Sequence, residues 1–124
     1  MKNDRSIKNV ITAELIEEFC KYAERRGEAV LDSRSRAANR MFDQMKAIDD
    51  VLRARGKDAR LALKPLLEHR NRFVRYYAAL YLLGMIPEEA RPIIEETATK
   101  WFDGLSGDAG MLLDAFDSGQ YKPD

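Results

Sequence analysis

The sequence is poor in the residues that most often carry chemistry, with one cysteine, one histidine and one tryptophan among 124 residues. The single cysteine, Cys20, excludes an intrachain disulfide and gives no sign of an oxidising compartment. Cys20 and His69 together cannot complete a zinc site, which takes several such ligands. His69 is also the only histidine that could serve a Ser-His-Asp or Cys-His arrangement. We therefore predict a protein that is not an enzyme, with no catalytic residues, no metal and no cofactor.

Long apolar runs and hairpin signals are lacking as well. The N-terminal stretch MKNDRSIKNVITAEL has no apolar signal-peptide core, and no later run reaches the roughly 18 apolar residues that a membrane-spanning helix needs. No Asn-Gly or Asp-Gly pair separates two alternating segments, as a β-hairpin would require. Apolar residues recur instead at three- and four-residue steps. We expect an all-α protein in the cytoplasm, without a membrane partner.

Capping residues, glycines and prolines predict the helix boundaries. A first helix is predicted over 12–26 with Gly27 as its left-handed stop, and a second over 33–55 ended by Gly56. A third segment begins at Asp58 and should break before Pro65, whose ring clashes with the preceding turn. The remaining helices are predicted over 72–84, 87–102 and 108–117, with GLSGDAG at 104–110 as a turn between helices. Residues 1–11 and 118–124 are expected to be tails, the second pinned by Tyr121.

The stretch NRFVRYYAALYLLGM at 71–85 should form the centre of the fold. Asn71 is a good N-cap, and the residues after it are apolar around most of a helix circumference. Such a helix must be covered on several sides, so we expect contacts with the second, third, fifth and sixth helices. The residues of this helix predicted to lie in the core are Val74, Tyr77, Ala78 and Tyr81.

An internal echo indicates a helical repeat. KPLLEHR at 64–70 matches RPIIEET at 91–97 in its basic residue, proline, two aliphatic residues and carboxylate. The run LALKPLLEHRNRFVRYYAALYLLG resembles a HEAT repeat, with a proline-kinked first helix and a second helix that begins near Val-Arg and closes with Leu-Gly. With RAANRMFDQMKAIDDVLRARG at 36–56 and DAGMLLDAFDSGQYKP at 108–123, the chain resembles the bacterial family of small HEAT-like proteins known as domain of unknown function 2019.

This resemblance implies a fold and little about activity. It covers about residues 10–123 and implies a right-handed α-α superhelix of about six helices, HEAT-like or armadillo-type. The length of the chain predicts a single domain over residues 1–124. The resemblance provides no catalytic or ligand residues to transfer. By analogy with small HEAT-like families that have been linked to immunity against bacterial toxins, it implies an immunity-protein-like role as one form of the function.

Charge is balanced overall but uneven along the chain. Residues 34–77 contain twelve basic and five acidic residues, whereas residues 78–124 contain three basic and nine acidic residues. The basic block could present a positive face to an acidic partner. Alternatively, the two blocks neutralise each other across helix contacts. Arg75 in particular is expected to pair with a carboxylate of a neighbouring unit, from Asp43, Asp49, Asp50, Asp58 or Glu68.

We predict that the chain is a protein-protein interaction module that binds an acidic protein through the basic block. Arginines and a tyrosine are typical of such interfaces, and the candidate partner-binding residues are Arg36, Arg40, Arg70, Arg72 and Tyr76. The same arginines could contact nucleic acid, although a dedicated binder would be basic as a whole. A third functional alternative is an enzyme whose active site forms only in an oligomer. The sequence leaves open whether the chain forms a homo-oligomer. His69 is expected to bind the terminal carbonyls of a helix.

Overall fold

Every regular element in the described part of the chain is a helix. The structure, a computed structural model, describes residues 6–123, so expectations for residues 1–5 and 124 lie outside it. Within residues 6–123 there is no strand, and the predicted all-α fold of about six helices is confirmed. The α-helices are α1 (Thr12–Leu31), α2 (Ser35–Arg55), α3 (Lys57–Leu61), α4 (Arg72–Leu82), α5 (Pro87–Lys100) and α6 (Gly104–Asp117), and the 3₁₀ helices are η1 (Ile7–Asn9) and η2 (Lys64–Glu68).

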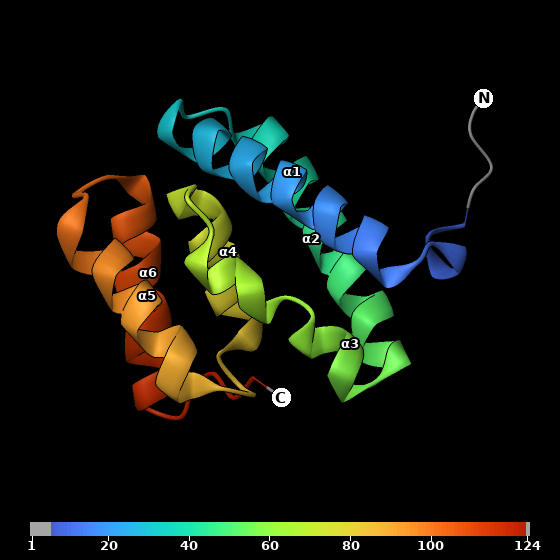
Figure 1. Ribbon diagram of the computed structural model, residues 1–124. Coiled ribbons are helices and arrows are strands. Elements are labelled where there is room, and N and C mark those ends of the chain that lie inside the picture. The colour runs from blue at the N-terminus through green and yellow to red at the C-terminus, as the bar shows by residue number, and fades with distance from the viewer. Residues whose placement is uncertain (1–5, 124) are drawn as a thin grey trace.

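Two antiparallel helix pairs, α1 with α2 and α5 with α6, flank the central helix α4 (Figure 1). Helix α4 packs mainly against α1, η2 and α5. The contact between α4 and α1 was not among the predicted contacts. It forms because the Phe73 ring of α4 lies directly against Gly27 of α1. Helix α2 reaches α4 through a stack of Phe42 on Tyr81, whose ring centroids are 6.4 Å apart.

The hydrophobic core lies where α1, α2, α4 and α5 meet. Val74, Tyr77 and Ala78 are buried as predicted, while Tyr81 is half-buried. The Tyr81 ring packs edge-on against Phe19 at a centroid distance of 5.8 Å. The largest fully buried side chains of the core are Leu15, Phe19, Met45, Ile48, Leu52, Leu63, Val74, Leu82, Leu83, Ile94 and Leu105.

Three predicted boundaries are present in the structure. Helix α2 ends at Gly56, whose positive φ of 113° is a backbone conformation that glycine adopts without steric cost. The third segment is broken, with α3 ending at Leu61 and η2 carrying Pro65 in its first turn. The Asn71 side-chain oxygen accepts hydrogen bonds from the backbone N–H of Phe73 (2.9 Å) and Val74 (3.2 Å), which makes it the N-cap of α4.

The structure corrects two other boundaries. Helix α1 runs through Gly27 to Leu31 because the missing side chain gives the Phe73 ring room, so this glycine serves packing and does not stop the helix. Helix α5 ends at Lys100, and α6 begins at Gly104, inside the segment predicted to be a turn. Asp103 is the reason, since its carboxylate caps the backbone N–H groups of Leu105 (3.0 Å) and Ser106 (3.2 Å).

The described parts of both predicted tails contact the helices. Val10 is buried in the core, and the Arg55 guanidinium donates to the Thr12 hydroxyl (3.0 Å) and to the carbonyl oxygens of Lys8 (3.0 Å) and Val10. Near the other end, the backbone N–H of Tyr121 donates to the Ala115 carbonyl at 3.0 Å. Residues 6–11 and 118–123 are therefore docked on the helical core.

Candidate partner-binding surface

The structure separates the five residues that were predicted to bind a partner. Tyr76 is only 3% exposed, and its ring packs edge-on against Tyr77 with centroids 5.0 Å apart. Burial, with a smaller effect of Tyr77, raises the pKa of the Tyr76 hydroxyl. Tyr76 therefore belongs to the core and offers nothing to a partner. The sequence predicts that this helix is covered on several sides but assigns only Val74, Tyr77, Ala78 and Tyr81 to the core, which leaves Tyr76 on the surface beside Arg72.

The basic block is partly neutralised by the acidic C-terminal part. Ion pairs that cross between them within residues 6–123 include Lys64 with Glu89 (3.4 Å), Arg72 with Asp103 (2.7 Å) and Arg75 with Glu96 (3.8 Å). At these three positions the acidic C-terminal part therefore neutralises the basic block, which was the alternative left open by the sequence. Among the described residues, the side chains of Arg36, Arg40 and Arg70 are exposed and form no ion pair.

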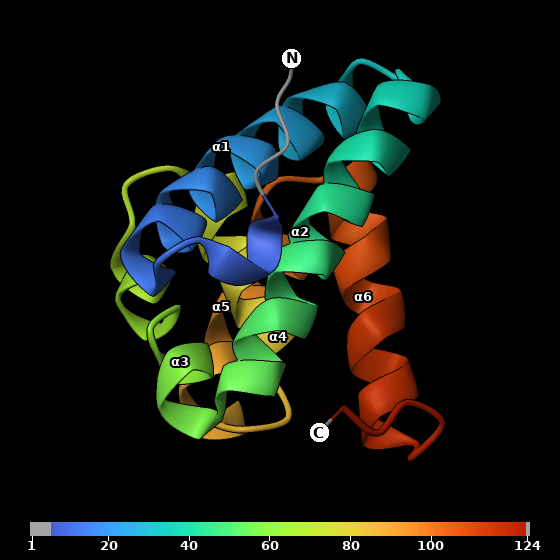
Figure 2. The ribbon, with the colours of Figure 1, turned by 90° about the vertical axis from the view of Figure 1, so that its right-hand side faces the viewer.

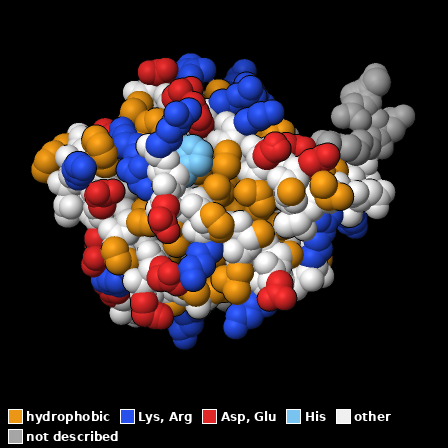
Figure 3. Space-filling model, viewed as in Figure 1, with side chains coloured by type: hydrophobic (Ala, Val, Ile, Leu, Met, Phe, Trp, Pro, Cys, Tyr) orange, Lys and Arg blue, Asp and Glu red, His pale blue; other side chains and the backbone are white. Residues whose placement is uncertain are grey.

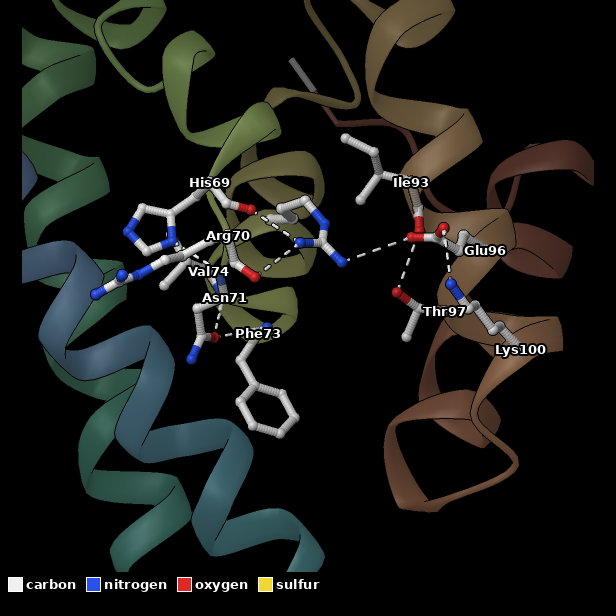
Figure 4. Close-up of polar contacts among 10 residues, drawn as sticks. His69, Arg70, Asn71, Phe73, Val74, Ile93, Glu96, Thr97 and Lys100 are labelled. Atoms are coloured by element: carbon white, nitrogen blue, oxygen red, sulfur yellow. Dashed lines mark hydrogen bonds and ion pairs between the residues drawn. The ribbon is translucent and has the colours of Figure 1, made fainter.

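Arg75 and His69 have structural roles at the start of α4 (Figure 4). The Arg75 guanidinium donates to the carbonyl oxygens of His69 (2.8 Å) and Arg70 (3.1 Å) in addition to its pair with Glu96. The carboxylate partner is therefore on α5 and is none of the five that were expected. The Nδ1 atom of His69 accepts a hydrogen bond from the backbone N–H of Asn71 at 3.0 Å, and within residues 6–123 no bond from His69 to a helix carbonyl is present, unlike the expected role.

Arg72 is held by three neighbours and forms the base of an aromatic cluster. Its guanidinium lies 4.5 Å from the centroid of the Phe73 ring and 4.4 Å from that of the Trp101 ring, and it donates to Asp103 at 2.7 Å. Partial burial raises the pKa of Asp103, but the hydrogen bond and charge of Arg72 and the capped backbone N–H groups outweigh it, so this pKa is lowered. The Arg72–Asp103 pair fixes the turn between α5 and α6 against the start of α4.

Phe102 stands out at this turn. Its side chain is 86% exposed, and its backbone has a φ of 52°, in the left-handed region that a bulky residue rarely adopts. The adjacent Trp101 is 36% exposed and also lies under the Lys100 ammonium, 4.9 Å from the ring centroid. The chain thus presents two neighbouring aromatic side chains to solvent beside cationic groups.

The turn between α5 and α6 meets the turn between α1 and α2 at one end of the molecule. The Cβ position of Gly104 is 3.3 Å from Val30 Cγ1, and the backbone N–H of Arg34 donates to the Ala29 carbonyl at 2.8 Å. Leu31, next to Val30, is 40% exposed. Figure 3 shows Lys and Arg side chains gathered beside the pale blue histidine, with hydrophobic side chains nearer the left edge. We call this region the end surface and define it as Leu31, Arg34, Arg36, Arg70, Arg72, Trp101 and Phe102.

Three of the predicted residues, Arg36, Arg70 and Arg72, thus belong to the end surface. Its apolar members, Leu31, Trp101 and Phe102, were not anticipated. Arg36 follows the turn between α1 and α2, and Arg70 precedes α4, whereas Arg40 lies a turn further along α2. Trp101 and Phe102 were predicted to be the last residues of a helix. The signal that could have found them is Asp103 with Ser106, a capping box that ends the preceding turn and starts α6.

The described residues include no other obvious chemical centre. No group of His, Cys, Asp and Glu side chains in residues 6–123 is arranged to hold a metal ion. Burial raises the pKa of the Cys20 thiol, and the charge of Glu17 adds to the effect. None of the described helices has the length and apolar character needed to cross a membrane.

Comparisons with known proteins identify one family model and one similar solved structure. The family model described as "Domain of unknown function (DUF2019)" matches residues 13–117. Among solved structures, the chain is similar to the crystal structure of the protein RPA1889 from Rhodopseudomonas palustris CGA009, with 37% sequence identity and a TM-score of 0.85, over 98% of this chain and 100% of that chain. No curated protein matches the chain.

Proposed function

Since the chain belongs to the family described as "Domain of unknown function (DUF2019)", which carries no activity in its description, we propose from the end surface that it is a non-enzymatic module that binds an acidic protein. The observation that carries the proposal is Phe102, a large apolar side chain exposed to solvent on a strained backbone. A HEAT-like superhelix built from the two helix pairs is part of the same proposal.

The energetics of Phe102 support a binding role. A left-handed backbone costs a residue with a side chain about 1–2 kcal/mol, and at 86% exposure Phe102 has almost no packing to offset that cost. Strain of this kind persists mainly at functional sites. A partner that buries the ring would offset it, since burying an aromatic side chain contributes about 1.5–3 kcal/mol.

The composition of the end surface also suits a protein partner. Aromatic residues and arginine are enriched at the energetic centres of interfaces. Trp101 is already held in place between Arg72 and Lys100, so little side-chain entropy would be lost when it is covered. Arg36 and Arg70 supply positive charge with no carboxylate partner among residues 6–123, which favours carboxylates on the partner. A toxin recognised by an immunity protein would be one such partner.

The test compares baits in a native lysate by mass spectrometry. Phe102→Gly removes the ring and relieves the strain, so this variant should be at least as stable as wild type and still lose the partner. Arg36→Glu/Arg70→Glu should lose it as well. The matched controls are Ile11→Gly, which removes another exposed apolar side chain, and Lys21→Glu/Lys57→Glu, which reverses two exposed charges elsewhere.

A captured protein counts as the partner only where both end-surface variants lose it and both controls retain it. Identical partners for wild type, Phe102→Gly and Arg36→Glu/Arg70→Glu would remove the proposal. Nucleic-acid binding through the same arginines predicts instead an affinity for duplex DNA or RNA that falls steeply with salt. The absence of any mobility shift at low salt would dismiss that alternative.

A further inference from the structure

A cavity of about 330 Å³ lies between α2, α4 and the C-terminal segment that follows α6. Figure 2 shows this segment turning back from the end of α6 toward α2 and α4. Tyr121 and Pro123 of the segment line the cavity together with Phe42, Leu80 and Tyr81. Small-molecule pockets have volumes of about 300–1,000 Å³, so this one is at the lower end of the range. None of its lining residues belongs to the end surface, which makes it a separate candidate site.

Two buried polar atoms of the lining have no hydrogen-bond partner among residues 6–123. They are Oδ1 of Asp49, whose side chain is only 4% exposed, and the hydroxyl oxygen of Tyr81. The other carboxylate oxygen of Asp49, Oδ2, accepts a hydrogen bond from Arg53 Nε at 2.8 Å. Burial raises the pKa of the Tyr81 hydroxyl and the charge of Asp49 adds to the effect, so the two groups lie within electrostatic reach of each other. Because buried polar atoms are costly to leave unpaired, this pair points to a bound group.

A bridging water is too small to account for the whole cavity. One water molecule takes up about 30 Å³ in the liquid, which is about a tenth of this volume. The remaining space would still face the half-buried side chains of Phe42 and Leu80, which offer no hydrogen bonds. A molecule with a polar end and an apolar body suits both parts of the lining.

The charges of the lining favour a cationic polar end. Lys46 pairs with Asp50 at 3.6 Å and Arg53 with Asp49 at 2.8 Å, so these four formal charges cancel. Asp49 Oδ1 still lacks a donor, whereas an anionic ligand would be repelled by this buried carboxylate. An ammonium group carries three donors, and its hydrogen bond to a carboxylate is about twice as strong as a bond between neutral groups.

We propose that this cavity binds a small primary amine with an apolar body. Its ammonium group donates to Asp49 Oδ1 and to the Tyr81 hydroxyl oxygen, and its body packs on Phe42 and Leu80. The rings of Phe42 and Tyr81 are stacked with their centroids 6.4 Å apart, and aromatic faces attract cations. The site goes beyond the proposed function, since it takes a small molecule and shares no residue with the end surface.

The experiment titrates the full, isotope-labelled chain with phenethylamine and follows the backbone amide shifts by NMR. The shifts of residues 46–53 and of Tyr121 should move and saturate, with the millimolar dissociation constant expected of so small a molecule. Phenethyl alcohol has the same shape without the charge, so it should bind about tenfold more weakly or less tightly still.

Two variants test the assigned contacts. Asp49→Asn and Tyr81→Phe should each weaken phenethylamine binding by about tenfold. Tyr81→Phe also removes an unpartnered buried hydroxyl, so this variant should melt at or above the wild-type temperature, and its result does not depend on a loss of folding. The matched controls are Asp43→Asn, at an exposed position of α2, and Tyr22→Phe, on α1. Neither position lines the cavity, so both controls should bind as wild type does.

Each of three results would overturn the proposal. The absence of any saturable shift with phenethylamine would mean that the cavity holds water only. Equal affinity for phenethyl alcohol would overturn the cationic ligand. Wild-type affinity of Asp49→Asn or of Tyr81→Phe would overturn the site as assigned. The test of the end surface uses neither the amine nor these variants, so the two proposals fail separately.

Discussion

Replacing Gly27 with alanine is expected to destabilise the protein, although alanine is the better helix former. Gly27 is buried in the interior of α1, where alanine would contribute about 1 kcal/mol from helix propensity. A Cβ atom at this position would lie 2.1 Å from Phe73 Cγ and 2.3 Å from Cδ1. Because Cγ is attached directly to the Phe73 Cβ, rotation of the ring about χ2 cannot clear it, so either Phe73 changes its χ1 rotamer and loses its packing or α1 and α4 move apart.

The size of the effect follows from two opposing contributions. Overpacking in a filled core costs about 1–3 kcal/mol, and an overlap of this depth belongs at the upper end. Subtracting the propensity gain leaves a net loss of about 2 kcal/mol in the free energy of unfolding. With 124 residues the unfolding entropy is about 0.26 kcal/mol/K, so the melting temperature should fall by about 8 °C.

Urea denaturation followed by circular dichroism measures the change at a common m-value. Gly107→Ala is the matched control, because this glycine lies in α6 and its Cβ position has no atom within 4 Å. It should stabilise the protein by about 1 kcal/mol. In a Phe73→Ala background the sign should reverse, and Gly27→Ala should become stabilising. A Gly27→Ala protein as stable as wild type would refute the contact between α1 and α4 as described.

Three further outcomes are expected. Leu82→Ala should lower the free energy of unfolding by about 2–5 kcal/mol because Leu82 is fully buried, and a cooperatively folded Leu82→Asp protein by circular dichroism would contradict the central place of α4. Asp103→Ala should cost about 1 kcal/mol through the lost N-cap. Since the pKa of Asp103 is lowered in the folded state, its contribution is present above the unfolded pKa and lost as pH falls through the folded pKa; a stability difference from wild type that widens on acidification would be inconsistent with this. Burial raises the pKa of Cys20, so iodoacetamide should alkylate it more slowly than a cysteine peptide, and equal rates would count against that burial.

Local signals alone determined most of the helical framework. Some boundaries depend only on atoms within about one helical turn: the Asn71 cap, the stop at Gly56 and the break at Pro65. Residues adjacent in the sequence therefore suffice to predict them. Periodicity likewise placed Val74 and Ala78 in the core. The resemblance of the whole chain to its family followed from the same kind of pattern.

The candidate site was only partly accessible to such reasoning. Arg36 and Arg70 are exposed as expected, but Tyr76 is in the core and Arg72 is engaged by Asp103, far along the chain. The exposed Phe102 depends on where α5 ends and α6 begins, and a capping box was needed to decide that.

By itself the sequence determined that the chain is helical, where most of its helices begin and end, and which stripe of the central helix is apolar. Only the tertiary structure decided that Gly27 is a contact point and no helix stop, that Lys64, Arg72 and Arg75 of the basic block pair with carboxylates of the acidic part, and that Tyr76 is buried in the core. The physical reason is range. Caps and propensities act between neighbours in sequence, whereas ring contacts, ion pairs and cavities join side chains that only packing brings together.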